Sequence, residues 1–312
     1  MRHISFEEGD GLLTWTDVAD AIAAGHRRPR ATIKDLLIER DGDSLLSRAA
    51  WIEGLGLAVK SMSIFPRNAA REPALPSVQG GMLLFDAETG APTTLVDGML
   101  VTKWKTAGDS VLGARLLARP SSRTLLVCGG GTVARSLVEA YREVFPGLST
   151  ILVWTRDPKK AEAFCADHAS DGATMEAAPD LHAALGRADI VSAATMAVSP
   201  FLTGADIRPG THVDLIGAYR PDMREGDDEL LARAEIFVDS RETTIGHIGE
   251  IEIPLKAGTI ALSDIRGDFY DLCAGAPGRS GPEAITLFKN GGGAHLDLMV
   301  GDLIRRAVTA AA

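Results

Sequence analysis

The segment 124–134, TLLVCGGGTVA, joins an apolar run to small residues whose spacing suits phosphate binding. Gly129, Gly131 and Ala134 stand at the G-x-G-x-x-A spacing of a strand-to-helix turn. In such a turn the first glycine permits the tight bend, the second lets the backbone approach a pyrophosphate, and the alanine lets the helix pack against its strand. The residues predicted to bind a dinucleotide here are Gly129, Gly131, Thr132, Val133 and Ala134.

A second apolar strand, 151–154, follows this turn and a stretch of helical spacing, which favours a dinucleotide site over a glycine-rich turn without a ligand. An NAD-binding unit usually ends its second strand with a carboxylate for the ribose 2′-hydroxyl, whereas this strand is followed by Thr155 and Arg156. Arg156 is suited to clamp a 2′-phosphate, so NADP(H) is favoured and NAD(H) stays possible. The alternative is that Asp157 only caps a helix over 157–169.

Lys60 is the other residue whose position indicates chemistry. In a strand over 56–65 it shares a face with Ala58, Met62 and Ile64, so a cation points the same way as an apolar row. Burial of that kind lowers the pKa of a lysine and makes it both an anion clamp and a proton donor. The alternative is that Lys60 reaches solvent at a sheet edge.

The composition indicates a globular protein of two domains, because 312 residues with 46% hydrophobic content are too many for a typical single core. A net charge of −10 argues against nucleic acid as a partner. The three cysteines are odd in number and far apart, which fits a reducing cytoplasm. We expect no membrane association and no metal, since the sequence shows no signal, no spanning apolar run and no metal-ligand spacing.

The elements that must position these residues fall into two regions. The first has a capped helix that opens at Thr14 and ends near Gly25, strands at 56–65 and 81–86, and a helix over 105–118. Beyond a polar joint, strands alternate with helical stretches in the pattern of a doubly wound parallel sheet of Rossmann type. These strands are predicted at 124–128, 151–154, 189–194, 211–217 and 235–239. The predicted domains are 1–120, to which an amphipathic C-terminal helix (294–312) returns, and 121–293.

With these elements in place, the chain resembles the ornithine cyclodeaminase and mu-crystallin family nearly end to end. The matching stretches, besides the glycine turn, are PR at 29–30, AVKSMSIFPRN at 58–68, QGGMLLFDAETGAP at 79–92, VTKWKTA at 101–107, IGAYRPDMRE at 216–225 and FKNGGGA at 288–294. The resemblance implies a Rossmann domain and a sheet-containing α+β domain that forms a homodimer, with the active site between the two. It also implies hydride exchange between a nicotinamide and the α-carbon of an amino acid or its imine.

Site residues also follow from the resemblance. The substrate carboxylate is expected at Arg30, Lys60 and Lys105, although the usual R-T-A is K-T-A here and lysine lacks the bidentate fork of arginine. The nicotinamide is expected near Ser77, Thr195, the backbone of 214–216 and Asn290, with Gly291 on the substrate side.

A departure from the family pattern bears on the reaction. Cyclodeaminases carry a catalytic acid in G-G-D-x-P, whereas Tyr219 stands in its place here, as a non-acidic residue does in ketimine reductases. Asp222 is expected to cap the turn that follows. His295 and Asp297 either relay a proton or, as we favour, cap and pack the last helix. Reduction of a preformed C=N bond needs only hydride and a proton, so it is the simpler assignment.

The sequence therefore predicts an NADPH-preferring reductase of cyclic α-imino acids, with pyrroline-2-carboxylate or piperideine-2-carboxylate as substrate and Lys60 as the catalytic residue. Two alternatives stay open. One is an ornithine cyclodeaminase or an alanine-type amino acid dehydrogenase, and the other is an NADPH-dependent protein of mu-crystallin type that binds a small ligand.

Overall fold

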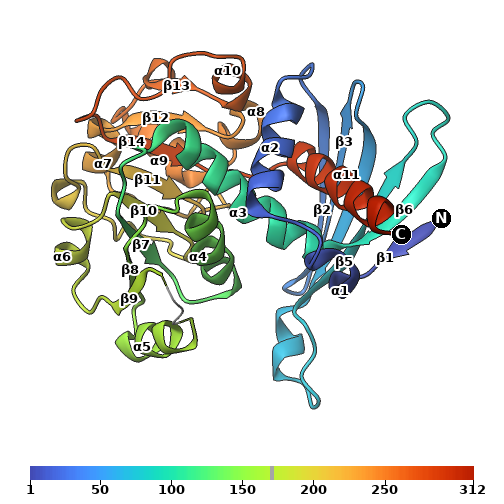
Figure 1. Ribbon diagram of the computed structural model, residues 1–312, viewed down its shortest axis with the longest axis horizontal. Coiled ribbons are helices and arrows are strands. Elements are labelled where there is room, and N and C mark those ends of the chain that lie inside the picture. The colour runs from blue at the N-terminus through green and yellow to red at the C-terminus, as the bar shows by residue number, and fades with distance from the viewer. Residues whose placement is uncertain (169–171) are drawn as a thin grey trace. The chain divides into compact units, whose positions relative to one another are not determined.

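The computed structural model describes residues 1–168 and 172–312, which form two compact units (Figure 1). The first unit is Met1–Lys105 together with Gly293–Ala312, and the second is Thr106–Gly292. The sequence predicts a boundary at residue 120, just after helix α3 (Gly98–Leu117), whereas the two units divide inside this helix. The helix begins well before the predicted residue 105, because the Asp97 carboxylate accepts hydrogen bonds from the amides of Met99 and Leu100 and so caps it early.

The second unit is built on a parallel sheet, as predicted. Among its described residues, eight strands lie in the order β13-β12-β14-β11-β10-β7-β8-β9, and every pairing is parallel. Its strands are β7 (Thr124–Cys128), β8 (Thr150–Trp154), β9 (Thr174–Ala177), β10 (Ile190–Ala193), β11 (His212–Leu215), β12 (Glu235–Val238), β13 (Ile265–Gly267) and β14 (Thr286–Lys289). Its helices, after α3, are α4 (Thr132–Val144), α5 (Pro158–Asp167), α6 (Leu181–Leu185), α7 (Asp228–Arg233), α8 (Arg241–Thr244), α9 (Gly249–Ala257) and α10 (Phe269–Cys273).

The strand order of this sheet indicates where a ligand would bind. From β7 the chain first adds β8 and β9 on one side and then β10 and β11 on the other, so the order reverses between β7 and β10. In doubly wound sheets, ligands bind at the carboxyl ends of the strands at this reversal. The glycine turn follows β7, and Thr195 follows β10, so both predicted cofactor segments lie at that point.

The first unit is a six-stranded sheet, all of whose residues are described, in the order β1-β6-β5-β4-β3-β2. Strand β1 pairs with β6 in parallel, and the remaining pairs are antiparallel. Its strands are β1 (Arg2–Ile4), β2 (Thr32–Arg40), β3 (Asp43–Ile52), β4 (Gly56–Ile64), β5 (Val78–Phe85) and β6 (Pro92–Asp97). Its helices are α1 (Phe6–Asp10), α2 (Trp15–His26) and α11 (Ala294–Ala311). Helix α11 lies across one face of the sheet, with α2 beside it (Figure 1).

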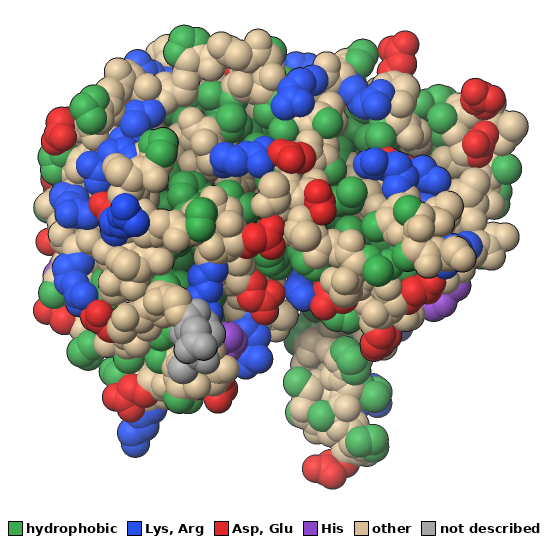
Figure 2. Space-filling view, viewed as in Figure 1, with side chains coloured by type: hydrophobic (Ala, Val, Ile, Leu, Met, Phe, Trp, Pro, Cys, Tyr) green, Lys and Arg blue, Asp and Glu red, His purple; other side chains and the backbone are tan. Residues whose placement is uncertain are grey.

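The two faces of this sheet differ in what covers them. On one face, Ala50, Ala58 and Met62 of β3 and β4 are buried, although Leu37 of the edge strand β2 on the same face is exposed. The opposite face, which we call the outer face, leaves large apolar side chains exposed. They are Leu36, Ile38, Leu45, Trp51 and Val59. Elsewhere on the surface, Figure 2 shows basic and acidic side chains interspersed over the face in view.

Candidate functional site

The glycine turn has the geometry that its sequence predicts. Gly129 has a φ of +135°, and an added Cβ would lie 2.8 Å from the Ala194 carbonyl oxygen, so only glycine fits. At Gly131, the N-cap of α4, an added Cβ would meet no atom within 4 Å, and no side chain caps the helix. The N-terminus of α4, at Gly131 and Thr132, is therefore exposed and uncapped, while Ala134 packs inside. These residues fit a pyrophosphate.

The segment after β8 has three polar residues with different roles. The Asp157 carboxylate accepts a hydrogen bond from the Lys159 amide at 3.2 Å, so this residue is the N-cap of α5, as the alternative interpretation proposes. Helix α5 ends at Asp167, and residue 169 of the predicted helix lies outside the described residues. The Thr155 hydroxyl donates to the Asp157 carbonyl at 2.6 Å. Arg156 is exposed, and no hydrogen bond or ion pair of its side chain occurs among the described residues.

A buried carboxylate, which sequence reasoning missed, fixes the loops after β10 and β11. Glu225 accepts hydrogen bonds from the Thr195 amide (2.8 Å), the Thr195 hydroxyl (2.7 Å) and the Gly217 amide (2.7 Å). Burial raises the pKa of Glu225 to about 7, although the Lys289 ammonium acts in the opposite direction. The position of Thr195, a predicted cofactor contact, is thus set by Glu225.

Two further buried charged groups, Glu250 and Lys289, act on the Glu225 carboxylate or on the backbone next to it. Glu250 accepts hydrogen bonds from the amides of Glu225 (2.7 Å) and Gly226 (3.0 Å), and burial raises its pKa as well. The Lys289 ammonium is fully buried and donates to the carbonyl oxygen of Leu215 at 2.9 Å. Burial lowers the pKa of Lys289, while the surrounding carboxylates raise it. Together these contacts hold the carboxyl ends of β11 and β14 in one arrangement.

Asn290 and Gly291, which follow β14 and are predicted to contact the ligands, are held by other residues of the second unit. The Asn290 side-chain amide donates to the Thr106 carbonyl oxygen (3.1 Å) and to the Ser110 hydroxyl (3.0 Å). At Gly291 an added Cβ would lie 2.4 Å from the Thr244 hydroxyl oxygen, so the position has room for glycine alone. Along the predicted backbone contact 214–216, the Asp214 side chain is fully buried, and burial raises its pKa to about 6.

The segment that lacks the family acid contains no free base. Tyr219 is 55% exposed. The Arg220 guanidinium binds both oxygens of Asp222, at 2.8 and 2.9 Å. The hydrogen bond from Arg220 lowers the pKa of Asp222, which makes this carboxylate a poor base. Its predicted role as a turn cap is therefore replaced by an ion pair.

In the first unit, Lys60 lies on the buried face of β4. Its side chain shares that face with Ala58 and Met62, as the alternation predicts, and only 5% of the residue is exposed. The alternative, in which the Lys60 side chain reaches solvent at a sheet edge, is wrong, because β4 lies between β3 and β5.

Asp297 of α11 is the ion-pair partner of Lys60. The Lys60 Nζ lies 2.5 Å from the Asp297 Oδ1, and a longer contact of 3.4 Å joins Nζ to the Thr102 hydroxyl. The expectation that His295 and Asp297 cap the last helix is wrong, because the N-cap is Gly293 and no side chain caps it. The packing half of that expectation is confirmed, because both residues lie on the buried side of α11. Burial holds the pKa of His295 well below its usual value, so the ring is neutral.

Lys105 joins the same buried group from α3. It is 8% exposed, and its charge acts on Lys60, Asp297 and His295. Burial would raise the pKa of Asp297, but the charges of Lys60, Lys105 and Arg48 together outweigh it and the pKa is lowered. The first unit therefore brings together two of the three predicted carboxylate-binding residues.

The remaining predicted residues lie in loops of the first unit. Arg30 is exposed between α2 and β2. Ser77 is half-buried, and its carbonyl oxygen accepts a hydrogen bond from the Phe65 amide at 2.7 Å. Their roles in binding stay predictions.

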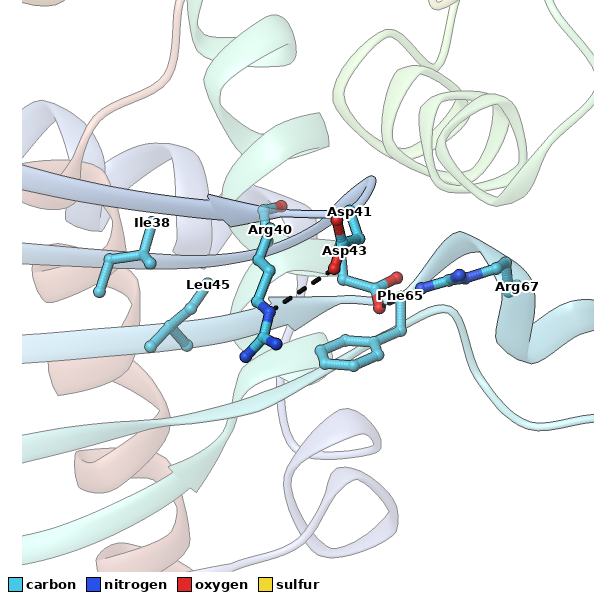
Figure 3. A pocket seen from close by; sticks show the side chains of 8 residues that line it. Ile38, Arg40, Asp41, Asp43, Leu45, Phe65 and Arg67 are labelled. Atoms are coloured by element: carbon cyan, nitrogen blue, oxygen red, sulfur yellow. Dashed lines mark hydrogen bonds and ion pairs between the residues drawn. The ribbon is translucent and has the colours of Figure 1, made fainter.

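A hollow of about 440 Å³ lies at the tip of the hairpin formed by β2 and β3 (Figure 3). Arg40, Asp43 and Phe65 line it, and none of the predicted site residues does. Within residues 1–168 and 172–312, no group of three or more histidine, cysteine or acidic side chains is arranged to hold a metal ion. No helix in the described part of the chain is long and apolar enough to cross a membrane.

Comparisons with known proteins agree with this architecture. The Delta(1)-pyrroline-2-carboxylate reductase of Paracoccus denitrificans is 52% identical over 308 residues, which cover 98% of this chain and 97% of that protein. The ketimine reductase mu-crystallin of Mus musculus is 34% identical over 74% of this chain and 70% of its own length. A solved Delta(1)-pyrroline-2-carboxylate reductase from Thermococcus litoralis, in complex with NADH and L-proline, matches with a TM-score of 0.92 and 29% identity, covering 100% of this chain and 98% of that one.

The model of the ornithine cyclodeaminase/mu-crystallin family matches residues 41–311, which include the glycine turn and both buried charge clusters. With the Rossmann-type sheet, the buried lysine pair and the relatives above, this match establishes that the chain belongs to the ornithine cyclodeaminase/mu-crystallin family.

Proposed function

We propose that this protein is a nicotinamide-dependent reductase of cyclic α-imino acids, which converts pyrroline-2-carboxylate or piperideine-2-carboxylate to L-proline or L-pipecolate. The observation that carries this proposal is the pair of buried lysines, Lys60 and Lys105, because such a cluster is a prepared site for a small carboxylate. The reductase from Paracoccus denitrificans, 52% identical along nearly the whole chain, supports the same reaction.

Each step of the reduction has a residue suited to it. Lys105, with Arg30 and Lys60, holds the substrate carboxylate and so orients the C=N bond. A bound nicotinamide supplies the hydride when reduced. Lys60 gives the proton to the imine nitrogen, because its ammonium is buried and directed by an ion pair. Orientation and proton donation are thus the contributions of this chain.

The structure supports reduction over cyclodeamination. Intramolecular deamination needs a base near the substrate amine, and the segment 217–221 offers Tyr219 in place of the family acid. The nearby Asp222 is held by Arg220 with both oxygens. Incubation with ornithine separates the two cases, because a cyclodeaminase would release ammonia and a reductase would not.

The cofactor preference rests on the end of β8. We propose that NADPH is preferred, because Arg156 is exposed and the Asp157 carboxylate is occupied as an N-cap. The Thermococcus litoralis relative is in complex with NADH, so both cofactors belong in the experiment. We would measure kcat/KM for NADPH and for NADH, each with a five-membered and a six-membered cyclic imine. Comparison of the four values shows which cofactor the enzyme prefers.

A substitution tests the catalytic role directly. We expect Lys60→Ala to lower kcat/KM by at least about 100-fold, the usual contribution of a general acid. An unchanged kcat/KM would remove Lys60 from the mechanism. Tight binding of a small ligand without turnover of any imine would instead favour a binding protein of mu-crystallin type.

The outer face of the first unit supports a homodimer. Trp51 is 58% exposed and Leu36 56%, and they lie on the same face as Ile38 and Val59. A group of large exposed apolar side chains on one face of a sheet is typical of a protein–protein contact. Light scattering of the purified protein would show twice the mass of the chain if the proposal is right and the mass of a single chain if it is wrong.

A further inference from the structure

We propose that Asp297 is a positioning residue of the reaction, which holds the Lys60 ammonium in one place and keeps it charged before the substrate arrives. The inference rests on the proposed function, in which Lys60 donates the proton. Asp297 itself need not touch the substrate.

The geometry of the pair is the first support. Lys60 comes from the middle of β4 and Asp297 from the first turns of α11, and their charged atoms lie 2.5 Å apart. Asp297 is 1% exposed. The only other hydrogen bond of the Lys60 ammonium among the described residues, to the Thr102 hydroxyl, is 3.4 Å long. Asp297 therefore determines where the ammonium points.

The second oxygen of Asp297 is further support. Its Oδ2 is buried and has no hydrogen-bond partner within the described residues. Buried polar atoms are normally paired, so a carboxylate retained only for stability would be expected to use both oxygens. The arrangement instead commits one oxygen to Lys60 and leaves the other unbonded, which is a pattern that functional sites tolerate.

The charges around Lys60 show why an anion is needed there. Burial lowers the pKa of Lys60 most, Asp297 raises it, and Lys105 and Arg48 lower it further. Arg48 (β3) is paired with Asp35 of β2 at 2.6 Å, and the rings of His295 (α11) and His26 (α2) meet edge to face. The charged groups that act directly on the pKa of Lys60 are Asp297 (α11), Lys105 (α3) and Arg48. Asp297 is the one acid in this set. Without it, the remaining influences all favour the neutral amine, which cannot donate a proton.

The proposed reduction adds one hydride and one proton to the C=N bond. Hydride from the nicotinamide forms the new C–H bond, and the π electrons of the C=N bond move to nitrogen. That nitrogen takes a proton from the Lys60 Nζ, which is left as a neutral amine beside the Asp297 carboxylate. Water returns the proton to Lys60, because the neighbouring negative charge favours the ammonium.

The experiment compares Asp297→Asn with Asp302→Asn over the range from pH 6 to 10. Asp302 lies on the same helix and is also buried, but it pairs with Arg305 and Arg306 of that helix and not with Lys60, so its variant is a matched control. For each protein, kcat is measured with the preferred cyclic imine and cofactor, and the Kd of the cofactor is measured by fluorescence.

We expect the loss of the carboxylate to move the alkaline limb of the kcat profile to lower pH by at least about one unit, since a charge partner shifts a pKa by that much. At pH 8 we expect kcat to fall by at least about tenfold. The cofactor Kd should be unchanged, and Asp302→Asn should match the original protein in both respects. An alkaline limb that stays in place in Asp297→Asn would overturn the inference.

A second variant covers the case in which Asp297→Asn does not fold. Asp297→Glu keeps the charge but displaces it, so we expect a lower kcat with the alkaline limb near its original pH. A wild-type kcat in Asp297→Glu would refute a positioning role. If the unchanged protein reduces no cyclic imine, the proposed function and this inference both fail, whereas an active enzyme with an unshifted limb contradicts the inference alone.

Discussion

Replacing Glu225 with glutamine is expected to change how the stability of this protein depends on pH. Burial raises the pKa of Glu225 to about 7 in the folded protein, against 4.5 for the free side chain. Between these values the folded state binds a proton that the unfolded state releases. Stability from this group is therefore fully present below about pH 4.5 and is lost as the pH rises through 7. Glutamine cannot titrate, so the variant lacks this dependence.

The size of the effect follows from the shift in pKa. Each pKa unit corresponds to about 1.4 kcal/mol, and the part of the shift that titrates between pH 5 and pH 8 amounts to about 2.5 kcal/mol. The free energy of unfolding of the original protein, minus that of Glu225→Gln, should fall by this amount over that range. Buried acids such as Asp214 are present in both proteins, so most of their contribution cancels in the difference.

Urea unfolding followed by circular dichroism at pH 5, 6, 7 and 8 measures this difference. Glu242→Gln is the matched control, because it makes the same substitution at an exposed side chain in α8 and its difference sets the baseline. If the difference for Glu225→Gln stays constant within about 0.5 kcal/mol, the range of a neutral surface substitution, the carboxylate does not titrate as its burial requires.

Four further predictions test the sites separately. Gly131→Ala should leave stability within about 0.5 kcal/mol but weaken NADPH binding at least about tenfold, because its Cβ enters only the predicted pyrophosphate space. Gly129→Ala should lower the free energy of unfolding by at least about 1 kcal/mol, because alanine is strained at this positive φ. Thermal unfolding measures the loss of stability in Gly129→Ala, and fluorescence titration measures the loss of NADPH binding in Gly131→Ala. Arg156→Ala should lower kcat/KM for NADPH about tenfold and leave that for NADH unchanged in steady-state assays. Trp51→Asp should convert the proposed dimer to a monomer, and a dimer that persists by light scattering would exclude the outer face as its interface.

Local features of the site could be predicted from the sequence because they depend on residues close together in the chain. The glycine turn needs a strand, a turn and a helix that follow one another directly, and each has its own signal. The two-residue period of β4 places Lys60 on the same face as Ala58 and Met62, whereas only the strand order excludes a side chain that reaches solvent at a sheet edge. Hairpin strands β2 and β3 were not predicted, because their apolar residues occur on the exposed outer face as well as on the buried one.

The partners of these residues could not be predicted in the same way. Asp297 meets Lys60 across 237 positions of sequence, and the alternation of a strand says nothing about which helix covers it. Glu225 stands in the acidic run REGDDE, where a solvated loop is the ordinary interpretation. The glycines at 217 and 226 are the one local signal that the chain packs closely there, since an added Cβ at Gly217 would lie 2.5 Å from the Glu225 carboxylate.

The two buried clusters differ in the sign of their charge, and this difference supports our proposal that the substrate binds at the cluster of the first unit. In the second unit, the buried acids Glu225, Glu250, Asp214 and Asp239 outnumber the buried cations Lys289 and Arg224, so further negative charge there would be repelled. In the first unit, Lys60 and Lys105 are buried with the single carboxylate of Asp297. An entering carboxylate would bring that cluster to neutrality. Because an uncompensated buried charge is costly, the first cluster gains most from an anionic substrate.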